Sequence, residues 1–212
     1  AIVKGDDFMK KTLKITIVFL IVILLFQSRI YGRNNPYNIA QGGNTYYQTV
    51  INTKELAIPI FEKMRSYLYY NLGGISVSYP YVLDLVTPEY LDQMAPATYK
   101  GMEVGLYTFE KNYHHIYIIN NLAVDQFLGT AAHEYAHAWQ TENCPLNQNI
   151  VLKEGFADWV AYKVLQMDGA INASQNIFYR SDPVYGKGFK IILSIEDRGG
   201  IQAVLDYVKT TP

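Results

Sequence analysis

The chain has little of what several common protein classes need. It has one cysteine in 212 residues, so no intrachain disulfide can form, and stability must come from packing and from any bound metal. Its 18 basic and 19 acidic side chains leave a net charge of −1, which gives no electrostatic attraction to nucleic acid. No internal repeat or low-complexity run is present. The remaining composition, half of it apolar, is typical of one ordinary globular domain.

Long hydrophobic runs are also scarce. Ile15 to Phe26 is apolar except for Thr16, and the basic stretch Met9 to Lys14 precedes it. A spanning helix needs about 20 apolar residues, whereas the core of an export signal needs about 7–15. We therefore predict that residues 1–32 are an upstream extension followed by a signal peptide or signal anchor, with Met9 as the start.

Two questions about this N-terminal segment stay open. Neither Ser28 nor Gly32 has a second small residue two positions earlier, so cleavage and retention as an anchor are both compatible with the sequence. A buried core helix is the alternative interpretation. The lysines before the apolar run predict that the following domain is exported, either secreted or anchored outside the cytoplasmic membrane. Contact with the membrane is expected only through this segment.

The clearest chemical signal lies in the second half of the chain. Residues 133–137 read His-Glu-Tyr-Ala-His, within a stretch of apolar residues that recur every three to four positions without proline. This pattern predicts a helix over about 124–141. Positions i and i+4 share one helix face, so His133 and His137 can offer both imidazoles to one metal ion, while Glu134 is turned about 100° away. The spacing indicates a zinc hydrolase.

A catalytic zinc ion takes a third protein ligand and leaves a fourth position to water. Glu154, which opens a second predicted helix over about 151–167, is the candidate third ligand. Asp158 lies one turn further and can hold the outer ring nitrogen of a ligating histidine. Cys144 is the alternative third ligand because thiolate binds zinc strongly, although its turn-like surroundings are typical of a small buried residue.

These residues resemble those of a known family. Metzincin peptidases need Gly three residues and His six residues after the second motif histidine, where this chain has Gln140 and Asn143. The match of His133, Glu134 and His137 with a downstream Glu154 and Asp158 instead resembles the gluzincin metallopeptidases. Within that clan, residues 113–169 look most like the peptidase domain of the plant LIM-domain, ubiquitin-activated growth-regulating peptidases and their bacterial relatives. Nothing in the chain resembles their LIM or ubiquitin-interacting modules, and one cysteine excludes a LIM module.

The rest of the chain predicts the elements around this motif. Residues 33–45 are rich in Asn, Gly and Gln and indicate a linker, which places the folded domain at 46–212. The expected elements, in chain order, are a helix over 56–68 interrupted or kinked at Pro59, a strand over 75–86, a short helix over 87–94, a hairpin of strands over 102–109 and 113–119, the two motif helices, and short helices around 189–195 and 200–208. This order predicts an α+β fold with a small antiparallel sheet over the metal helix and a helical C-terminal half. The arrangement is zincin-like.

Three further side chains are candidates for roles in the cleft. The strand 113–119 is the candidate edge that pairs with an extended peptide substrate. His114 and His115 lie on this strand and point to opposite faces of it, so at most one of them faces the cleft. Tyr185, on a loop rich in Gly and Pro, is a candidate donor to the tetrahedral oxyanion, and one more packed tyrosine is the alternative. Trp139 is expected in the core.

The function predicted from these observations is hydrolysis of peptide bonds. One zinc ion is held by His133, His137 and Glu154, and Glu134 is the general base. The expected partner is a peptide or protein substrate. Two alternatives remain: a zinc-stabilised binding module without turnover, and a zinc amidase acting on cell-wall peptide, whose chemistry would be the same.

Overall fold

The computed structural model describes residues 47, 49–95 and 104–212. Within them the strands are β1 (Val50–Ile51), β2 (Tyr81–Val86), β3 (Gly105–Glu110), β4 (Tyr113–Ile119) and β5 (Leu122–Ala123). The helices are α2 (Lys54–Asn71), α3 (Pro88–Met94), α4 (Val124–Asn143), α5 (Ile150–Asp168), α6 (Ile171–Phe178) and α7 (Tyr185–Thr210). The predicted α+β class is confirmed, with small sheets first and a mainly helical C-terminal half.

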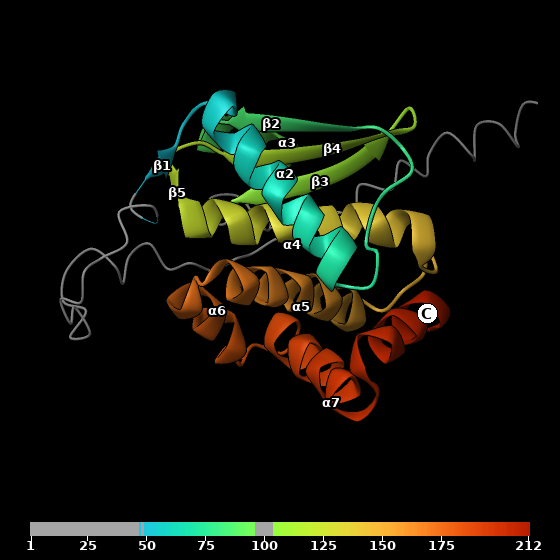
Figure 1. The fold of residues 1–212 in the computed structure, drawn as a ribbon. Helices are drawn as coiled ribbons and strands as arrows, with labels where there is room; N and C mark the ends of the chain where they lie inside the picture. Colours follow the sequence, from blue (N-terminus) through green and yellow to red (C-terminus); the bar gives the residue numbers. More distant parts are fainter. Residues whose placement is uncertain (1–46, 48, 96–103) are drawn as a thin grey trace, which may run out of the picture.

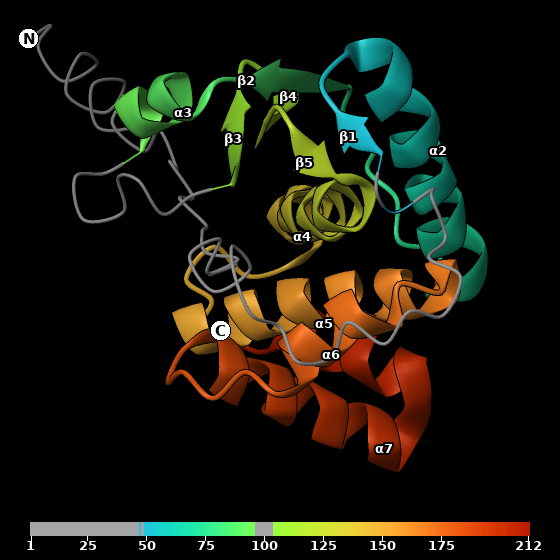
Figure 2. The same cartoon turned by 90° about the vertical axis from the view of Figure 1, so that its left-hand side faces the viewer.

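The elements form layers around α4. Figure 1 shows the larger sheet on one side of α4, and α5, α6 and α7 on the other. In Figure 2, α4 is seen almost end-on between these two layers, with α2 beside it. Helix α2 packs against both α4 and α5, and α5 packs against α7. Helix α4 is therefore enclosed by protein along most of its length, which agrees with the burial of nearly all its residues from Val124 to Gln140.

The larger sheet has three strands in the order β2-β4-β3. Strands β3 and β4 pair antiparallel and form the predicted hairpin, whose turn places Lys111 and Asn112 at positive φ. Strand β2, however, runs parallel to β4. The expectation of an antiparallel sheet is therefore wrong for this pair, because β3 runs opposite to β2 and the hairpin turn reverses the chain again, so that β4, which lies between them, runs in the direction of β2.

The topology also corrects the predicted edge strand. Strand β4 (Tyr113–Ile119) lies between β2 and β3 and is hydrogen-bonded on both sides, so it cannot pair with a peptide. In the described part of the chain, β3 pairs with β4 alone. The edge next to the motif helix is therefore β3.

The helices begin and end largely as the sequence predicts. Thr87 caps α3 by accepting a hydrogen bond from the backbone of Tyr90, with proline in the first turn. Helix α5 ends at Gly169, whose φ of 84° is the left-handed conformation typical of a glycine cap. Helix α2 continues through Pro59 without interruption. The two predicted C-terminal helices are the halves of α7, which change direction at Gly200 (φ 72°).

Two helix backbones cross at very short range next to the candidate third ligand. A Cβ atom added to Gly155 would lie 2.2 Å from the backbone carbonyl carbon of Gly188, and one added to Gly188 would lie 2.0 Å from the carbonyl oxygen of Val151. Only glycine at both positions leaves room for this approach. The contact brings the first turn of α7 against the part of α5 that carries Glu154.

The predicted segments 1–32 and 33–45 lie outside the described residues, as does the predicted start of the domain at residue 46. Among the helices that the structure describes, none combines the length and apolar character needed to cross a bilayer.

Candidate metal centre

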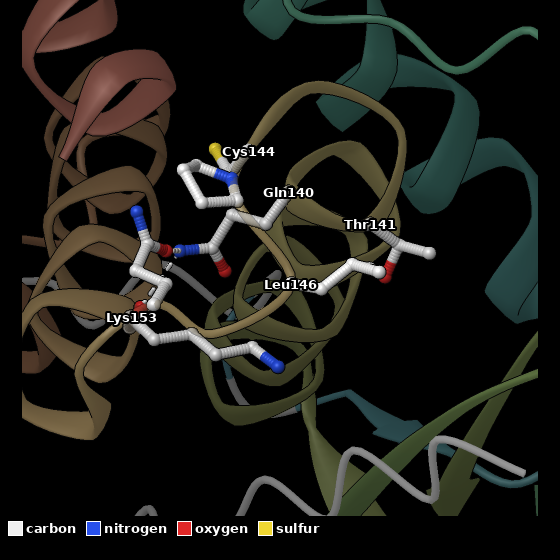
Figure 3. Close-up of a pocket in the computed structure, with 7 residues that line it drawn as sticks. Gln140, Thr141, Cys144, Leu146 and Lys153 are labelled. Atoms are coloured by element: carbon white, nitrogen blue, oxygen red, sulfur yellow. Dashed lines mark hydrogen bonds between the residues drawn. The ribbon is translucent and has the colours of Figure 1, made fainter. Parts of the chain in front are cut away.

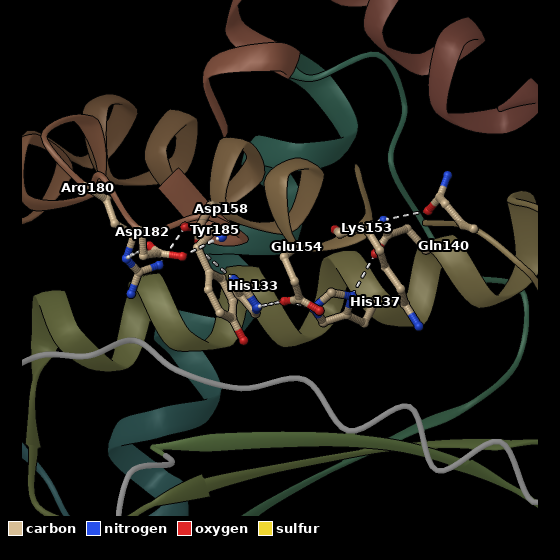
Figure 4. Close-up of polar contacts among 10 residues, drawn as sticks. His133, His137, Gln140, Lys153, Glu154, Asp158, Arg180, Asp182 and Tyr185 are labelled. Carbon is tan, nitrogen blue, oxygen red and sulfur yellow. Dashed lines mark hydrogen bonds and ion pairs between the residues drawn. The ribbon is translucent and has the colours of Figure 1, made fainter. Parts of the chain in front are cut away.

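Three buried side chains from two helices meet at one point. His133 and His137 extend from the same face of α4, and Glu154 extends from the first turns of α5. The Oε2 atom of Glu154 lies 3.4 Å from Nε2 of His133 and 3.8 Å from Nε2 of His137. One possible ligand atom from each residue lies within 4.8 Å of the others. Figure 4 shows the three side chains pointing toward one another.

The arrangement of these atoms fits a divalent cation. Both Nε2 atoms and both carboxylate oxygens of Glu154 are buried without a hydrogen-bond partner. Buried polar atoms are almost always hydrogen-bonded, so such a convergence of lone pairs needs an explanation. Two imidazole nitrogens and one carboxylate are the donor set of a common catalytic zinc site. We conclude that His133, His137 and Glu154 form a group that can hold one metal ion.

The outer nitrogen of His133 is held by an ionic chain. Its Nδ1 atom lies 3.1 Å from Oδ1 of Asp158, and the other oxygen of Asp158 accepts a 2.6 Å hydrogen bond from the guanidinium of Arg180. Asp158 is fully buried between these two partners. When Nδ1 of His133 shares its proton with Asp158, the Nε2 atom keeps a lone pair that faces the centre.

His137 is held by a neutral group instead. Its Nδ1 atom lies 2.6 Å from Oε1 of Gln140, one turn further along α4. The amide nitrogen of Gln140 then donates to the backbone carbonyl of Lys153, at 3.0 Å, immediately before Glu154. Gln140 therefore orients one imidazole and also joins α4 to the part of α5 that carries the third ligand.

The surroundings shift the pKa values of the three ligand residues in different directions. Burial works to lower the pKa of His133, but Asp158 and Glu154 outweigh it and raise that pKa to about 10. Burial holds the pKa of His137 well below its usual value, and the charge of His133 adds to this effect. Burial also raises the pKa of the Glu154 carboxyl to about 7. A cation bound here would replace the proton on His133, so metal binding should release a proton.

Replacing Asp158 by alanine should weaken zinc binding about 10- to 100-fold, because the orienting acceptor for His133 is lost and Arg180 is left beside the ligand. Competition against a zinc-responsive dye would measure the affinity. Asp168→Ala is the matched control, since Asp168 is a carboxylate of the same helix whose partners, Lys63, Tyr47 and Tyr67, lie away from the centre. Equal zinc affinities of Asp158→Ala and the unaltered protein would make Asp158 an ordinary helix residue.

Glu134 occupies the space between α4 and the edge strand β3. It is buried, and a Cβ atom added to Gly105 would lie only 2.7 Å from its Oε1 atom. Because Gly105 has no side chain, the Glu134 carboxylate has room beside the start of β3. Glu134 is not a member of the convergent ligand group, as its turn around the helix axis predicts.

Tyr185 lies beside the centre. It begins α7, its ring centroid is 6.3 Å from that of His133, and the guanidinium of Arg180 lies 5.0 Å from the centre of its ring. Asp182 fixes this turn by accepting hydrogen bonds from the backbone of Tyr185 and of Gly186. Burial, together with the nearby carboxylates, raises the pKa of the phenol. Tyr185 therefore stays protonated and is a hydrogen-bond donor.

The other predicted candidates lie away from the ligand group. Cys144 caps the end of α4 and lines a small pocket together with Gln140 and Lys153 (Figure 3), but it is not part of the convergent group. His114 is buried in a different network, between the hydroxyl of Tyr107 at 2.8 Å and Glu142 at 2.7 Å. His115 lies on the opposite face of β4 and stacks on Tyr117. Trp139 is in the core, as expected.

Sequence reasoning missed several residues that complete this centre. Arg180, Gln140 and Gly105 belong to no motif, and each acts through a contact that only the folded chain creates. Gln140 alone had a signal in the sequence: it follows His137 by three positions, which places it on the same helix face.

Comparisons of the chain with protein-family models, with curated proteins and with solved structures give no significant match.

Proposed function

We propose that the protein is a zinc-dependent peptidase with a zincin-like fold, of the gluzincin type that its motif resembles. The observation that supports this most directly is the buried convergence of His133, His137 and Glu154, with Glu134 beside it on the same helix. A purely structural zinc site is closed by four protein ligands. Here the group of described residues supplies three, which leaves a position for water.

In the proposed reaction, the zinc ion and the side chains of the protein have different roles. A bound zinc ion would polarise the scissile carbonyl and lower the pKa of a water molecule toward about 7. The Glu134 carboxylate accepts the proton of the attacking water and delivers it to the leaving amine. The Tyr185 phenol donates a hydrogen bond to the oxyanion that develops on the former carbonyl oxygen. Asp158 and Gln140 keep both imidazoles in the orientation that the ion requires.

We place the substrate along β3, the strand of the larger sheet that packs most closely on α4. Gly105 places the start of this strand against Glu134, and the outer edge of β3 has no strand partner in the described part of the chain. An extended peptide can add to such an edge through main-chain hydrogen bonds, which would draw its scissile bond past Glu134. We therefore assign peptide binding to β3.

A combined metal and cleavage experiment tests this function. The protein, stripped with a chelator and reloaded with one equivalent of zinc, is incubated with a mixed peptide library, and the products are identified by mass spectrometry. We expect cleavage with zinc, loss of cleavage after chelation, and recovery when zinc is restored. Stoichiometric zinc without any cleaved peptide would favour a binding module instead. Cleavage that persists in the stripped protein would contradict the proposed mechanism.

A further inference from the structure

A polar pocket lies on the other side of the motif helix from the metal centre, beside Tyr135. Tyr135 is two residues after His133 and two before His137, which places it on the opposite face of α4. Its ring packs against Phe61 of α2 with the ring centroids 5.8 Å apart, whereas the two histidines face Glu154 of α5. Figure 2 shows α2 and α5 on different sides of α4. The pocket is therefore separate from the metal centre.

One face of α2 forms the main wall of this pocket. The residues of α2 that line it recur with the spacing of a single helix face: Glu62, Arg65, Ser66, Tyr69 and Tyr70. Ile75 and Ser76, which follow the end of the helix, and Tyr135 complete the lining. The pocket has a volume of about 250 Å³, below the roughly 300–1,000 Å³ of sites that bind drug-sized ligands. It therefore has room for one small ring.

The charged groups of the pocket neutralise one another. The Nη1 atom of Arg65 donates to Oε2 of Glu62 and to the hydroxyl of Tyr81, both at 2.7 Å. That hydroxyl donates in turn to the other carboxylate oxygen of Glu62, at 2.5 Å. The guanidinium also lies over the ring of Tyr81, 4.6 Å from its centroid. Arg65 and Glu62 thus form a hydrogen-bonded pair without net charge, which gives the pocket no electrostatic preference for an anion or a cation.

The wall of the pocket also carries hydroxyl groups. The Ser66 hydroxyl donates to the backbone carbonyl of Glu62 at 3.0 Å, so its oxygen keeps lone pairs that can accept a hydrogen bond. Ser76 is exposed on the segment that follows α2, and its hydroxyl can both donate and accept. The pocket therefore suits a ligand that is neutral and carries donors and acceptors of its own.

Two exposed tyrosine rings add an apolar contact surface. Tyr69 is 54% exposed and Tyr70 is 79% exposed, and their ring centroids lie 5.0 Å apart at an interplanar angle of 87°. A tyrosine provides a large, rigid contact area at a small cost in side-chain entropy, which is why it is common in binding surfaces. The C–H face of a sugar ring can pack on such a tyrosine while the sugar hydroxyls bind the neutral polar groups of the wall.

We propose that this pocket binds one neutral sugar ring of a glycan. An anionic group such as a phosphate would be repelled by the Glu62 carboxylate, and a cationic group would be repelled by Arg65. A purely apolar ring would cover the serine hydroxyls without giving them a hydrogen-bond partner. A sugar ring meets both requirements because it is uncharged and has hydroxyl groups around an apolar face. The site does not depend on the proposed peptidase function.

Glycans matched in size but not in charge test the proposal. The unaltered protein is titrated by calorimetry with soluble oligomers of galactose and of N-acetylglucosamine, and with their charged counterparts, oligomers of galacturonic acid and of glucosamine. We expect a neutral oligomer to bind more tightly than its charged counterpart, and removal of zinc by a chelator to leave its Kd unchanged. The proposal is wrong if neither neutral oligomer binds, or if the charged member of each pair binds more tightly.

Tyrosine variants locate the binding. Tyr70→Ala should raise the Kd of the neutral oligomer about 3- to 10-fold, the range of one aromatic contact, and Tyr70→Phe should keep most of the affinity because it keeps the ring. Tyr179→Ala is the matched control, since Tyr179 is 74% exposed but lies at the end of α6, outside the pocket. Melting temperatures show that each variant is folded.

Two results of these measurements would overturn the proposal. Equal Kd values for Tyr70→Ala and Tyr179→Ala would place the glycan elsewhere on the protein. NMR titration of the backbone amides supplies the second result: a neutral peptide that shifts the amides of Ser66 and Ser76, where no glycan does, would assign the pocket to a protein partner instead. Neither result would affect the zinc site, because the pocket contains none of the metal ligands.

Discussion

Glu134→Gln should reduce peptide hydrolysis about 10²- to 10⁴-fold, the usual contribution of a positioned general base, while the protein still binds one zinc ion. The amide has the shape of the carboxylate, so it can occupy the same space against Gly105, but it cannot accept the proton of the attacking water. The ligands His133 and His137 are unchanged in this variant. We therefore expect the rate of peptide hydrolysis to fall while the zinc content stays the same.

Steady-state cleavage and metal analysis on the same sample would measure both quantities. Glu89→Gln is the control for loss of one carboxylate, because Glu89 is exposed on α3. A Glu134→Gln variant that cleaves at the rate of the unaltered protein would show that another group takes the proton. A variant that loses its zinc would show that Glu134 supports the metal rather than the water.

The motif and its partners were largely predictable because they depend on local geometry. The i, i+4 spacing of His133 and His137 fixes a shared face once the segment is a helix, and α4 is a helix over that whole stretch. The same spacing relates Glu154 to Asp158 on α5, and both side chains face α4. Both segments are helical over their whole predicted length, so short-range information was sufficient.

The topology of the sheet was not predictable from the same information. The hairpin of β3 and β4 follows from two alternating segments around a tight turn, but the position of β2 depends on a parallel pairing between residues more than thirty positions apart. That pairing makes β4 central and moves the free edge to β3. The eight-residue helix α6 was missed because it is too short for its periodicity to stand out.

The arrangement of the side chains around the centre depends on tertiary contacts that no sequence pattern reveals. Gly155 and Gly188 allow α5 and α7 to cross closely, and this crossing sets Tyr185 beside His133. A lone glycine after Glu154 does not reveal which backbone it will meet. Arg180, likewise, lies between two helices in the sequence, and only the folded structure shows that it donates a hydrogen bond to Asp158.

Glu154→Ala should weaken zinc binding by more than the roughly 10- to 100-fold expected for loss of an orienting partner, because it removes a ligand itself. Two imidazoles without the carboxylate leave the ion with too few protein donors for a stable tetrahedral site. The unaltered protein should melt at a higher temperature when zinc is added, since a ligand that binds only the folded state stabilises it. In Glu154→Ala this zinc-dependent shift should disappear.

Cys144→Ala is the matched control for the choice of third ligand. Cys144 lies outside the convergent group, and burial raises the pKa of its thiol to about 12, which disfavours the thiolate that zinc requires. Its removal should therefore leave both the zinc affinity and the thermal shift unchanged. The opposite result, with zinc retained by Glu154→Ala and lost by Cys144→Ala, would move the third ligand to the end of α4. Residue 154 would then be a buried carboxylate without a metal, and the peptidase assignment would lose its main support.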